Sequence, residues 1–247
     1  MLVKSQVKYI QSLGHKKFRD QEGVFVAEGP KGVQELLKAG NMRPVHVYAL
    51  AEWLGEEQPA IRSLPPSSIT TLRQEELERI SSLTTPNQVL VVFTKPEFPT
   101  FDFGNSLSLL LDGIQDPGNL GTILRIADWF GIRQVACSTD CADVFNAKTV
   151  QSTMGSICRV GVMYGDLPAL VARYPGLPVF GATLEGRSVY EMERPGKGMI
   201  VIGNESKGIR PELLAAIRVP VTIPRIGSAE SLNAAVATGI ILSHLVG

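Results

Sequence analysis

Hydrophobic residues in the second half of the chain form short continuous runs that alternate with amphipathic segments. The runs LSLLLD (107–112) and MIVIG (199–203) are almost entirely apolar, as expected for strands buried on both faces of a sheet. Shorter runs at 133–137, 178–183 and 219–223 predict three more strands. Helices are predicted at 119–130, 145–153, 166–173, 210–217 and 230–246. Strands that alternate with helices predict a parallel sheet covered on both faces.

A smaller set of elements precedes this pattern. Strands are predicted at 23–29, 45–50 and 88–94, and helices at 30–40 and 72–83. Residues 94–106 contain Pro96, Pro99 and Gly104, which interrupt regular structure and predict a linker. The expected organisation is a small α/β domain (1–95), a linker (96–106) and a larger α/β domain (107–247).

Composition narrows the class of protein. The 247 residues are 44% hydrophobic and 19% charged, which is ordinary for a soluble globular chain. No apolar run reaches the roughly 18 residues of a membrane span, and the N-terminus does not resemble a signal peptide. Three cysteines are an odd number without zinc-ligand spacing, so reduced thiols are expected. These features together predict a cytoplasmic location.

Charge points to one local patch rather than to a uniformly basic surface. The formal net charge is zero, which argues against nucleic-acid binding over the whole surface. The first twenty residues nevertheless concentrate basic side chains with one acid, Asp20. They are Lys4, Lys8, His15, Lys16, Lys17 and Arg19. We expect Lys16, Lys17 and Arg19 to contact RNA phosphates, with a solvated charged face as the alternative.

The loop after strand 107–112, DGIQDPGNLG, has unusual chemistry. Its Gly118 and Gly121 fit neither the dinucleotide-binding fingerprint nor the phosphate loop. Asn119 is a candidate cap for the next helix. Arg125 lies outside the apolar stripe of that helix and shares a face with Asp128. It is therefore either a surface arginine paired with Asp128 or a functional residue.

Two more strand ends carry glycine-rich loops. Strand 199–203 stops at Gly203, and Gly208 closes the loop NESKG. Strand 219–223 stops at Pro224, before a loop that leads to Ser-Leu-Asn at 231–233. Ordinary turns and helix capping by Ser228 or Ser231 are the simpler interpretation of each loop alone. Parallel sheets bind ligands at the carboxyl ends of their strands, which favours a shared site.

Together these loops resemble the three motifs of the SpoU (TrmH-like) RNA ribose 2'-O-methyltransferases of the SPOUT superfamily. The motifs are Asn119, Gly121 and Arg125, then Gly203, Glu205 and Gly208, then Ile223, Pro224, Gly227, Ser231, Leu232 and Asn233. The resemblance covers about residues 106–246. The N-terminal part is similar, more loosely, to the RNA-binding domain that precedes the catalytic domain in many members. Arg225, where many members carry Met, and the pair Ala229-Glu230 depart from the pattern.

The resemblance implies a C-terminal trefoil knot, S-adenosylmethionine as cofactor, and a homodimer. It implies a catalytic set of Arg125, Asn119, Glu205, Ser231 and Asn233. It assigns cofactor contacts to Gly203, Ile223, Leu232, Thr183, Leu184 and Gly208, and it needs no metal. Because an arginine stays protonated, we interpret Arg125 as a cation that grips RNA phosphate and stabilises the developing alkoxide. A general-base role for Arg125 stays open.

Methyl transfer to a ribose 2'-hydroxyl is the function that this resemblance implies. Ribosomal RNA is favoured as substrate over transfer RNA, which stays an alternative. A non-catalytic RNA-binding protein of the same fold is a second alternative, disfavoured by the complete motif set. A nicotinamide dehydrogenase is a third, weakened by the absent G-x-G-x-x-G.

Overall fold

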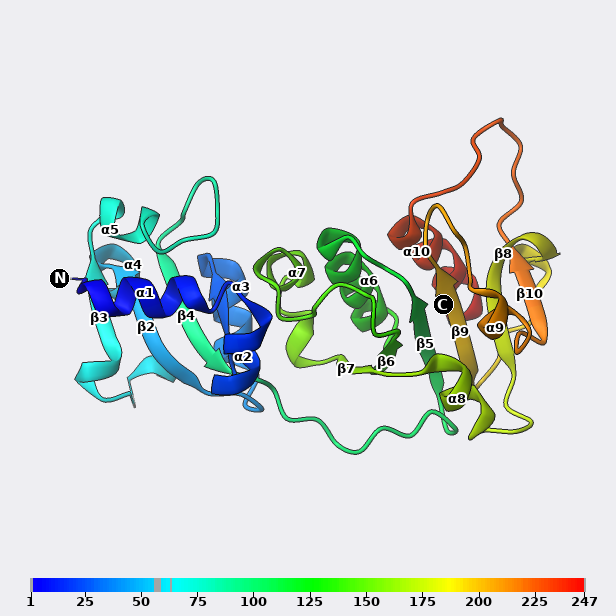
Figure 1. Ribbon diagram of the computed structural model, residues 1–247, viewed down its shortest axis with the longest axis horizontal. Helices are drawn as coiled ribbons and strands as arrows, with labels where there is room; N and C mark the ends of the chain where they lie inside the picture. Colours follow the sequence, from blue (N-terminus) through cyan, green and yellow to red (C-terminus); the bar gives the residue numbers. More distant parts are fainter. Residues whose placement is uncertain (1, 56–58, 63, 247) are drawn as a thin grey trace. The chain divides into compact units, whose positions relative to one another are not determined.

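A computed structural model describes residues 2–55, 59–62 and 64–246. The chain forms two compact units (Figure 1). Unit 1 consists of Met1–Phe98 and Phe145–Cys158, and unit 2 of Pro99–Val144 and Arg159–Gly247. The segment 145–158 therefore belongs to the first unit although unit 2 residues flank it on both sides.

Unit 1 is built on a mixed sheet with the strand order β1-β4-β2-β3. Its strands are β1 (Val24–Glu28), β2 (Pro44–Leu50), β3 (Ile69–Leu72) and β4 (Val89–Thr94). Strand β4 pairs antiparallel with β1 and β2, whereas β2 and β3 are parallel. The helices are α1 (Lys4–Ser12), α2 (Lys16–Glu22), α3 (Pro30–Leu37), α4 (Ala51–Gly55), α5 (Gln74–Glu78) and α7 (Ala147–Thr153). Short 3-10 turns lie at Pro59–Ile61, Pro66–Ser68 and Ser156–Cys158.

The segment around α7 packs closely into unit 1. The rings of Phe25 on β1 and Phe145 lie 5.2 Å apart. The Asn41 side-chain amide donates to the carbonyl oxygen of Cys158 at 2.9 Å. A Cβ atom at Gly155 would lie 2.6 Å from the Cβ of Glu35, so only glycine permits this approach to α3.

Unit 2 contains a six-stranded sheet in the order β10-β8-β9-β5-β6-β7. Its strands are β5 (Leu107–Asp112), β6 (Gln134–Cys137), β7 (Gly161–Tyr164), β8 (Val179–Ser188), β9 (Gly198–Gly203) and β10 (Val219–Thr222). The helices are α6 (Pro117–Trp129), α8 (Leu167–Ala172), α9 (Pro211–Leu214) and α10 (Ala234–Leu245), with a 3-10 turn at Val189–Glu191. Every strand pair in this sheet is parallel, which confirms the predicted architecture.

Hydrophobic layers cover the sheet of unit 2 on both faces. Leu110 of β5 and Val201 of β9 pack with Leu167 and Leu170 of α8 and Leu213 of α9. Side chains alternate across a strand, so neighbours such as Leu109 face the other side, where α6 and α10 pack together. All six residues of β5 are buried, as its apolar run predicts. The loop after β5 therefore extends from a fully buried strand between β9 and β6.

Several predicted elements need correction. The segment 72–83 was expected to be one helix, but β3 ends at Leu72 and only 74–78 are helical. The last helix begins at Ala234 instead of 230, because residues 223–233 form an extended loop. Helix α6 begins at Pro117, two residues before the predicted start. Each difference lies at an element end, where local propensity competes with capping and loop geometry.

Candidate active site

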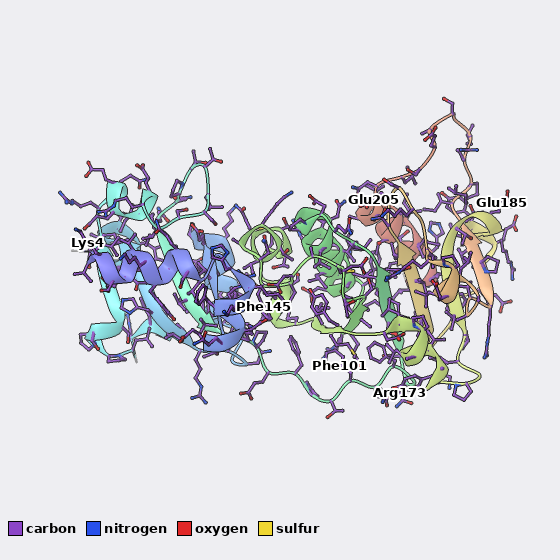
Figure 2. The ribbon with its side chains drawn as sticks, in the orientation of Figure 1. Lys4, Phe101, Phe145, Arg173, Glu185 and Glu205 are labelled. Carbon is purple, nitrogen blue, oxygen red and sulfur yellow. The ribbon has the colours of Figure 1, made fainter. Side chains whose placement is uncertain are left out.

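The loops that carry the three motifs converge on one edge of the unit 2 sheet. Strands β10, β8, β9 and β5 are consecutive neighbours in the sheet and run parallel. Their carboxyl ends therefore lie at the same edge, where ligands bind in open α/β sheets. Figure 2 shows Glu185 of β8 and Glu205, which follows β9, at one end of this unit, with Phe101 and Arg173 at the other end. The topology thus gathers the motif residues.

Helix α6 places Asn119 in its first turn. Asp116 is the N-cap, and its carboxylate accepts from the backbone N–H of Asn119 at 2.9 Å. The prediction that Asn119 caps this helix is therefore wrong, because the acid three residues earlier takes that role. The Asn119 side chain is instead directed across the site, where its Nδ2 donates to Oε1 of Glu205. This hydrogen bond joins the first motif to the second.

Asn233 joins the third motif to the first. It caps α10, because its Oδ1 accepts from the backbone N–H groups of Ala235 and Val236. Its Nδ2 donates to Oδ1 of Asn119 at 2.9 Å. A continuous chain of side chains, from Asn233 through Asn119 to Glu205, therefore links the three loops. We call these three residues the polar triad.

Ser231 is not part of the polar triad. It is exposed, and within the described part of the chain its side chain forms no hydrogen bond. Neither Ser228 nor Ser231 caps α10, so the simpler interpretation of the third loop as a serine cap is wrong.

The loop 204–208 is held tightly against the end of β5. Asn204 donates from Nδ2 to the carbonyl oxygen of Gly113 at 2.8 Å, and its Oδ1 accepts from the N–H groups of Ser206 and Lys207. A Cβ atom at Gly203 would lie 2.5 Å from the backbone carbon of Gly208. Sequence reasoning identified the glycines but missed Asn204, which occupies a variable position of the motif.

Arg125 is exposed on the solvent side of α6. It makes no side-chain hydrogen bond or ion pair with any residue that the structure describes. Asp128 does not pair with Arg125, since its Oδ2 accepts from Nε of Arg159 at 2.8 Å. The alternative of an Arg125–Asp128 surface pair is therefore wrong. The guanidinium is left available for a ligand.

Four of the six residues expected to contact the cofactor lie on or directly after three adjacent strands. Thr183 and Leu184 are on β8, Gly203 ends β9, and Ile223 follows β10. Leu184 and Leu232 are both exposed, at 77% and 45%. Residues 223–233, drawn in orange to red, extend away from the sheet between β10 and α10 (Figure 1). Gly208 has the left-handed φ of 69° and bonds back to Asn204 through both backbone groups.

A charged cluster at the end of β5, which was not predicted from the sequence, consists of Asp112, Arg210 and Asp140. Asp112, the last residue of β5, is buried and accepts from the backbone N–H and Nε of Arg210 at 2.8 and 2.6 Å. The bond with Asp112 raises the pKa of Arg210. Arg210 also pairs with Asp140, whose pKa is lowered chiefly by the Ser138 hydroxyl. The signal was a single charged residue at the end of an apolar strand.

Two thiols lie beside this cluster. Cys141 accepts from the backbone N–H of Ile114 at 3.2 Å. A hydrogen bond with Cys137 lowers the pKa of Cys141 to about 7 and raises that of the buried Cys137 well above its ordinary value. None of the three cysteines forms a disulfide.

The basic residues of unit 1 have different environments. Lys16 is exposed and pairs with Asp20 at 2.5 Å. Lys17 is exposed as well and has no ion-pair partner among the described residues. Arg19 is only 3% exposed, and its Nη1 donates to the carbonyl oxygens of Leu13 and Gly14. The prediction that Arg19 lies on a solvent-facing basic patch is therefore wrong, because its guanidinium stabilises the turn between α1 and α2.

A shallow, largely apolar groove is lined by residues of α6 and α10. Its volume is about 380 Å³, and its lining residues are Asn119, Thr122, Ile126, Asn233, Ala235, Val236, Gly239 and Ile240. Two polar triad residues therefore stand at one end of an otherwise largely apolar surface.

The described residues contain neither a cluster suited to a metal ion nor a membrane-spanning helix. No group of three or more His, Cys, Asp or Glu side chains there is arranged to hold a metal ion. None of the helices in that part of the chain is long and apolar enough to span a membrane.

Comparisons with known proteins match both parts of the chain. The SpoU rRNA Methylase family model matches residues 106–243, and the MRM3-like substrate binding domain matches residues 4–91. The 23S rRNA (guanosine(2553)-2'-O)-methyltransferase RlmP of Bacillus subtilis is 32% identical over 98% of this chain and 96% of its own length.

Solved structures agree with the sequence matches. A TrmH-family protein from Porphyromonas gingivalis is 41% identical in sequence, and its structure superposes with a TM-score of 0.86. The alignment covers 99% of this chain and 98% of the P. gingivalis chain. An AdoMet-bound rRNA methyltransferase from Sinorhizobium meliloti has 28% identity and a TM-score of 0.84, with coverage of 99% and 95%. The alignment with the TrmH/SpoU tRNA modifying enzyme of A. aeolicus covers only 57% of this chain and 74% of the A. aeolicus chain, with 27% identity and a TM-score of 0.50.

The parallel sheet, the three loops at its carboxyl edge and these similarities define the class of RNA methyltransferases with a SPOUT-type catalytic domain. Within that class, the chain belongs to the SpoU rRNA methylase family.

Proposed function

We propose that this protein transfers a methyl group from S-adenosylmethionine to a ribose 2'-hydroxyl of ribosomal RNA. The observation that carries the proposal is the polar triad, in which Asn233, Asn119 and Glu205 connect three motif loops at the ligand-binding edge of the sheet. The relatives that act on ribosomal RNA match both units, which favours ribosomal over transfer RNA as the substrate.

The residues at the sheet edge fit S-adenosylmethionine, which supplies an electrophilic methyl group when bound. Gly203 lets two backbone segments approach more closely than any side chain would permit. Residues 224–233 are exposed, so their backbone groups are accessible to a ligand. The proposed contacts to the cofactor are Thr183, Leu184, Gly203, Gly208, Ile223 and Leu232. The side-chain-poor edge suits recognition through backbone N–H and C=O groups.

Arg125 is the proposed catalytic cation. Its guanidinium is exposed and has no partner among the described residues, so it needs no rearrangement to meet a phosphate. It stays protonated, which suits electrostatic stabilisation of an alkoxide better than proton abstraction. The polar triad, with Ser231 nearby in sequence, shapes the surface on which the ribose is positioned.

The N-terminal and C-terminal parts of the chain have separate proposed roles. Residues 1–95 bind RNA, with Lys16 and Lys17 on the surface, and residues 107–247 bind the cofactor and carry out transfer after the linker 96–106. The match of residues 4–91 to a substrate binding domain supports this division. A trefoil knot through loop 223–233 and α10 is proposed from the family resemblance, as is a cytoplasmic location.

A homodimer through the groove between α6 and α10 is also proposed. Ile126 and Val236 give the groove an apolar lining, and Val236 is 51% exposed in the single chain. Burial of such a surface against a second copy removes it from water. Sedimentation equilibrium of wild type and Val236→Lys tests this proposal, since a lysine in the groove should shift the protein towards monomer.

Calorimetry and methylation mapping test the function. Titration of the folded protein with S-adenosylmethionine and with S-adenosylhomocysteine should release or absorb heat and give a single class of site. Mapping of 2'-O-methyl groups in total RNA from cells with and without the gene should show one site lost from large-subunit ribosomal RNA. Loss of a site from transfer RNA alone would favour the alternative substrate. An unchanged methylation pattern with no cofactor binding would refute the proposal.

A further inference from the structure

Trp129, the last residue of α6, is unusually exposed. Its side chain is 85% accessible to solvent, whereas the other tryptophan of the chain, Trp53, is fully buried. Tryptophan has a large apolar surface that folding normally buries. Exposure of nearly all of this side chain leaves its aromatic faces accessible to a ligand.

Trp129 lies on the same side of α6 as Arg125. The two residues are four positions apart, so they are about 6 Å apart along the helix axis and about 40° apart around it. Arg133 follows the helix and is exposed as well. Asp128 does not neutralise this surface, because its carboxylate pairs with Arg159. The exposed aromatic ring is therefore preceded and followed in the sequence by cationic side chains.

We propose that Trp129 is a stacking platform for an unpaired RNA base next to the nucleotide that is methylated. The inference rests on the proposed function, because it takes Arg125 to hold a phosphate at the target nucleotide. Proteins that read single-stranded RNA stack its bases on aromatic side chains while cations hold the backbone. A phosphate at Arg125 places the base of a neighbouring nucleotide within reach of the indole one helical turn away. Trp129 would thereby select an unstacked, single-stranded target.

RNA fits this surface better than a second copy of the chain does. Trp129 and Arg125 do not line the groove between α6 and α10, and they lie about 60° and 100° around the helix from Ile126, which does. Arg125 and Arg133, which come before and after Trp129 in the sequence, are both exposed. Cations beside an aromatic ring suit single-stranded RNA, because the cations hold its phosphates while its bases stack on the ring.

Kinetics on four proteins test the proposal: wild type, Trp129→Ala, Trp129→Phe and Leu214→Ala. Leu214 is a matched control, because it is 45% exposed on α9, on the opposite face of the sheet. With an unmethylated transcript of large-subunit ribosomal RNA, Trp129→Ala should raise KM for RNA roughly ten- to a hundred-fold, the range of one lost stacking contact. Trp129→Phe should recover most of the loss, and Leu214→Ala should match wild type. Affinity for S-adenosylmethionine and the melting temperature should stay unchanged in all four.

Tryptophan fluorescence gives a second measurement that needs no methyl transfer. Acrylamide should quench the exposed Trp129 in free protein, and the same transcript should protect it, while the buried Trp53 contributes little to quenching. Unchanged KM in Trp129→Ala together with no protection would overturn the proposal. Weaker self-association of Trp129→Ala in sedimentation equilibrium, with unchanged KM, would instead assign Trp129 to an interface between copies. If the transcript protects Trp129 from acrylamide but the wild-type protein does not methylate it, Trp129 still contacts RNA and the proposed function is wrong.

Discussion

Arg125 provides the sharpest test at the scale of single residues. Because its side chain is exposed and has no partner among the described residues, Arg125→Ala should change the free energy of unfolding by less than about 1 kcal/mol. Binding of S-adenosylmethionine should be retained, since other loops hold it. Methyl transfer should fall about 10²-fold or more, as when one preorganised charge stabiliser is removed. Tritium transfer to unmethylated RNA, calorimetry and thermal melts measure the three quantities.

Arg125→Lys refines that test, because an ammonium group lacks the planar fork that holds two phosphate oxygens. The lysine variant should remain impaired. A folded Arg125→Ala protein that binds cofactor and still methylates at the wild-type rate would make Arg125 an ordinary surface residue.

Gly203 is expected to tolerate no side chain. A methyl group there would approach backbone atoms of Gly208 and Ile209 to 2.5–2.7 Å, and backbone cannot rotate away as a flexible side chain does. Gly203→Ala should therefore destabilise the protein by about 1–3 kcal/mol and weaken S-adenosylmethionine binding. Gly196→Ala is the matched control, because no atom lies within 4 Å of its added Cβ. Equal denaturation midpoints for the two variants would contradict the close approach.

Residue roles were predicted unevenly from the sequence. Asn119, Glu205 and Asn233 were singled out by their motifs, and the structure brings them together. Their partners could not be predicted, because hydrogen bonds between residues 86 and 114 positions apart depend on tertiary placement. The clustering of basic residues predicts that Arg19 contacts RNA, but its side chain is buried and its Nη1 donates to two backbone carbonyl oxygens, a tertiary placement that the sequence does not show.

At the scale of elements, Asn233 both caps α10 and contacts Asn119. Asn233→Ala should lower the free energy of unfolding by about 1 kcal/mol through the lost cap. It should also reduce methyl transfer more than ten-fold, because the polar triad is broken. Asp166→Ala is the control, since Asp166 caps α8 through the N–H of Ala169 and is not part of the polar triad. It should lose similar stability with unchanged activity, measured by urea unfolding and tritium transfer. Equal methyl transfer by Asn233→Ala and Asp166→Ala would show that catalysis does not need the polar triad.

Asp20 gives a pH-dependent link between α2 and the end of β4. Hydrogen bonds from Lys16 and Lys95 lower its pKa from 3.8 to about 2. The unfolded chain therefore binds more protons in this range, and the stabilisation is complete above about pH 4 and disappears as the pH falls towards 2. The difference in unfolding free energy between wild type and Asp20→Asn should shrink over that interval. Urea titrations at pH 5, 4, 3 and 2.5 measure it, and a constant difference would exclude the two lysine contacts as its cause.

Most elements of unit 2 could be predicted, because its buried strands are continuous apolar runs and parallel topology follows from alternation with helices. Unit 1 was harder to predict. Its strand β3 has two partly buried residues, one exposed residue and one buried residue, so it shows little periodicity. The β7 strand, GVMY, was missed for the same reason, since only Gly161 is fully buried.

At the scale of the whole molecule, RNA affinity should depend on salt through Lys17. A contact with one phosphate contributes roughly 0.7 to 0.9 to the slope of log affinity against log salt concentration. Lys17→Ala should reduce the slope by about that amount, whereas Lys16→Ala should have a smaller effect because Asp20 already engages the Lys16 ammonium. Filter binding of the ribosomal RNA transcript between roughly 50 and 300 mM salt measures both slopes, because the Debye length is about 10 Å near the middle of that range and shortens as salt is added. Unchanged slopes in both variants would leave this surface without a role in binding.

The assignment of residues 145–158 to unit 1 has a consequence for synthesis and for proteolysis. The chain passes between the units after Phe98, Val144 and Cys158. A nascent chain therefore cannot complete its first unit until residue 158 has left the ribosome, by which time β5, α6 and β6 of the second unit are already outside. A protease that cuts once within 96–106 should likewise release no free domain, because the C-terminal fragment still supplies Phe145 and α7 to the N-terminal one.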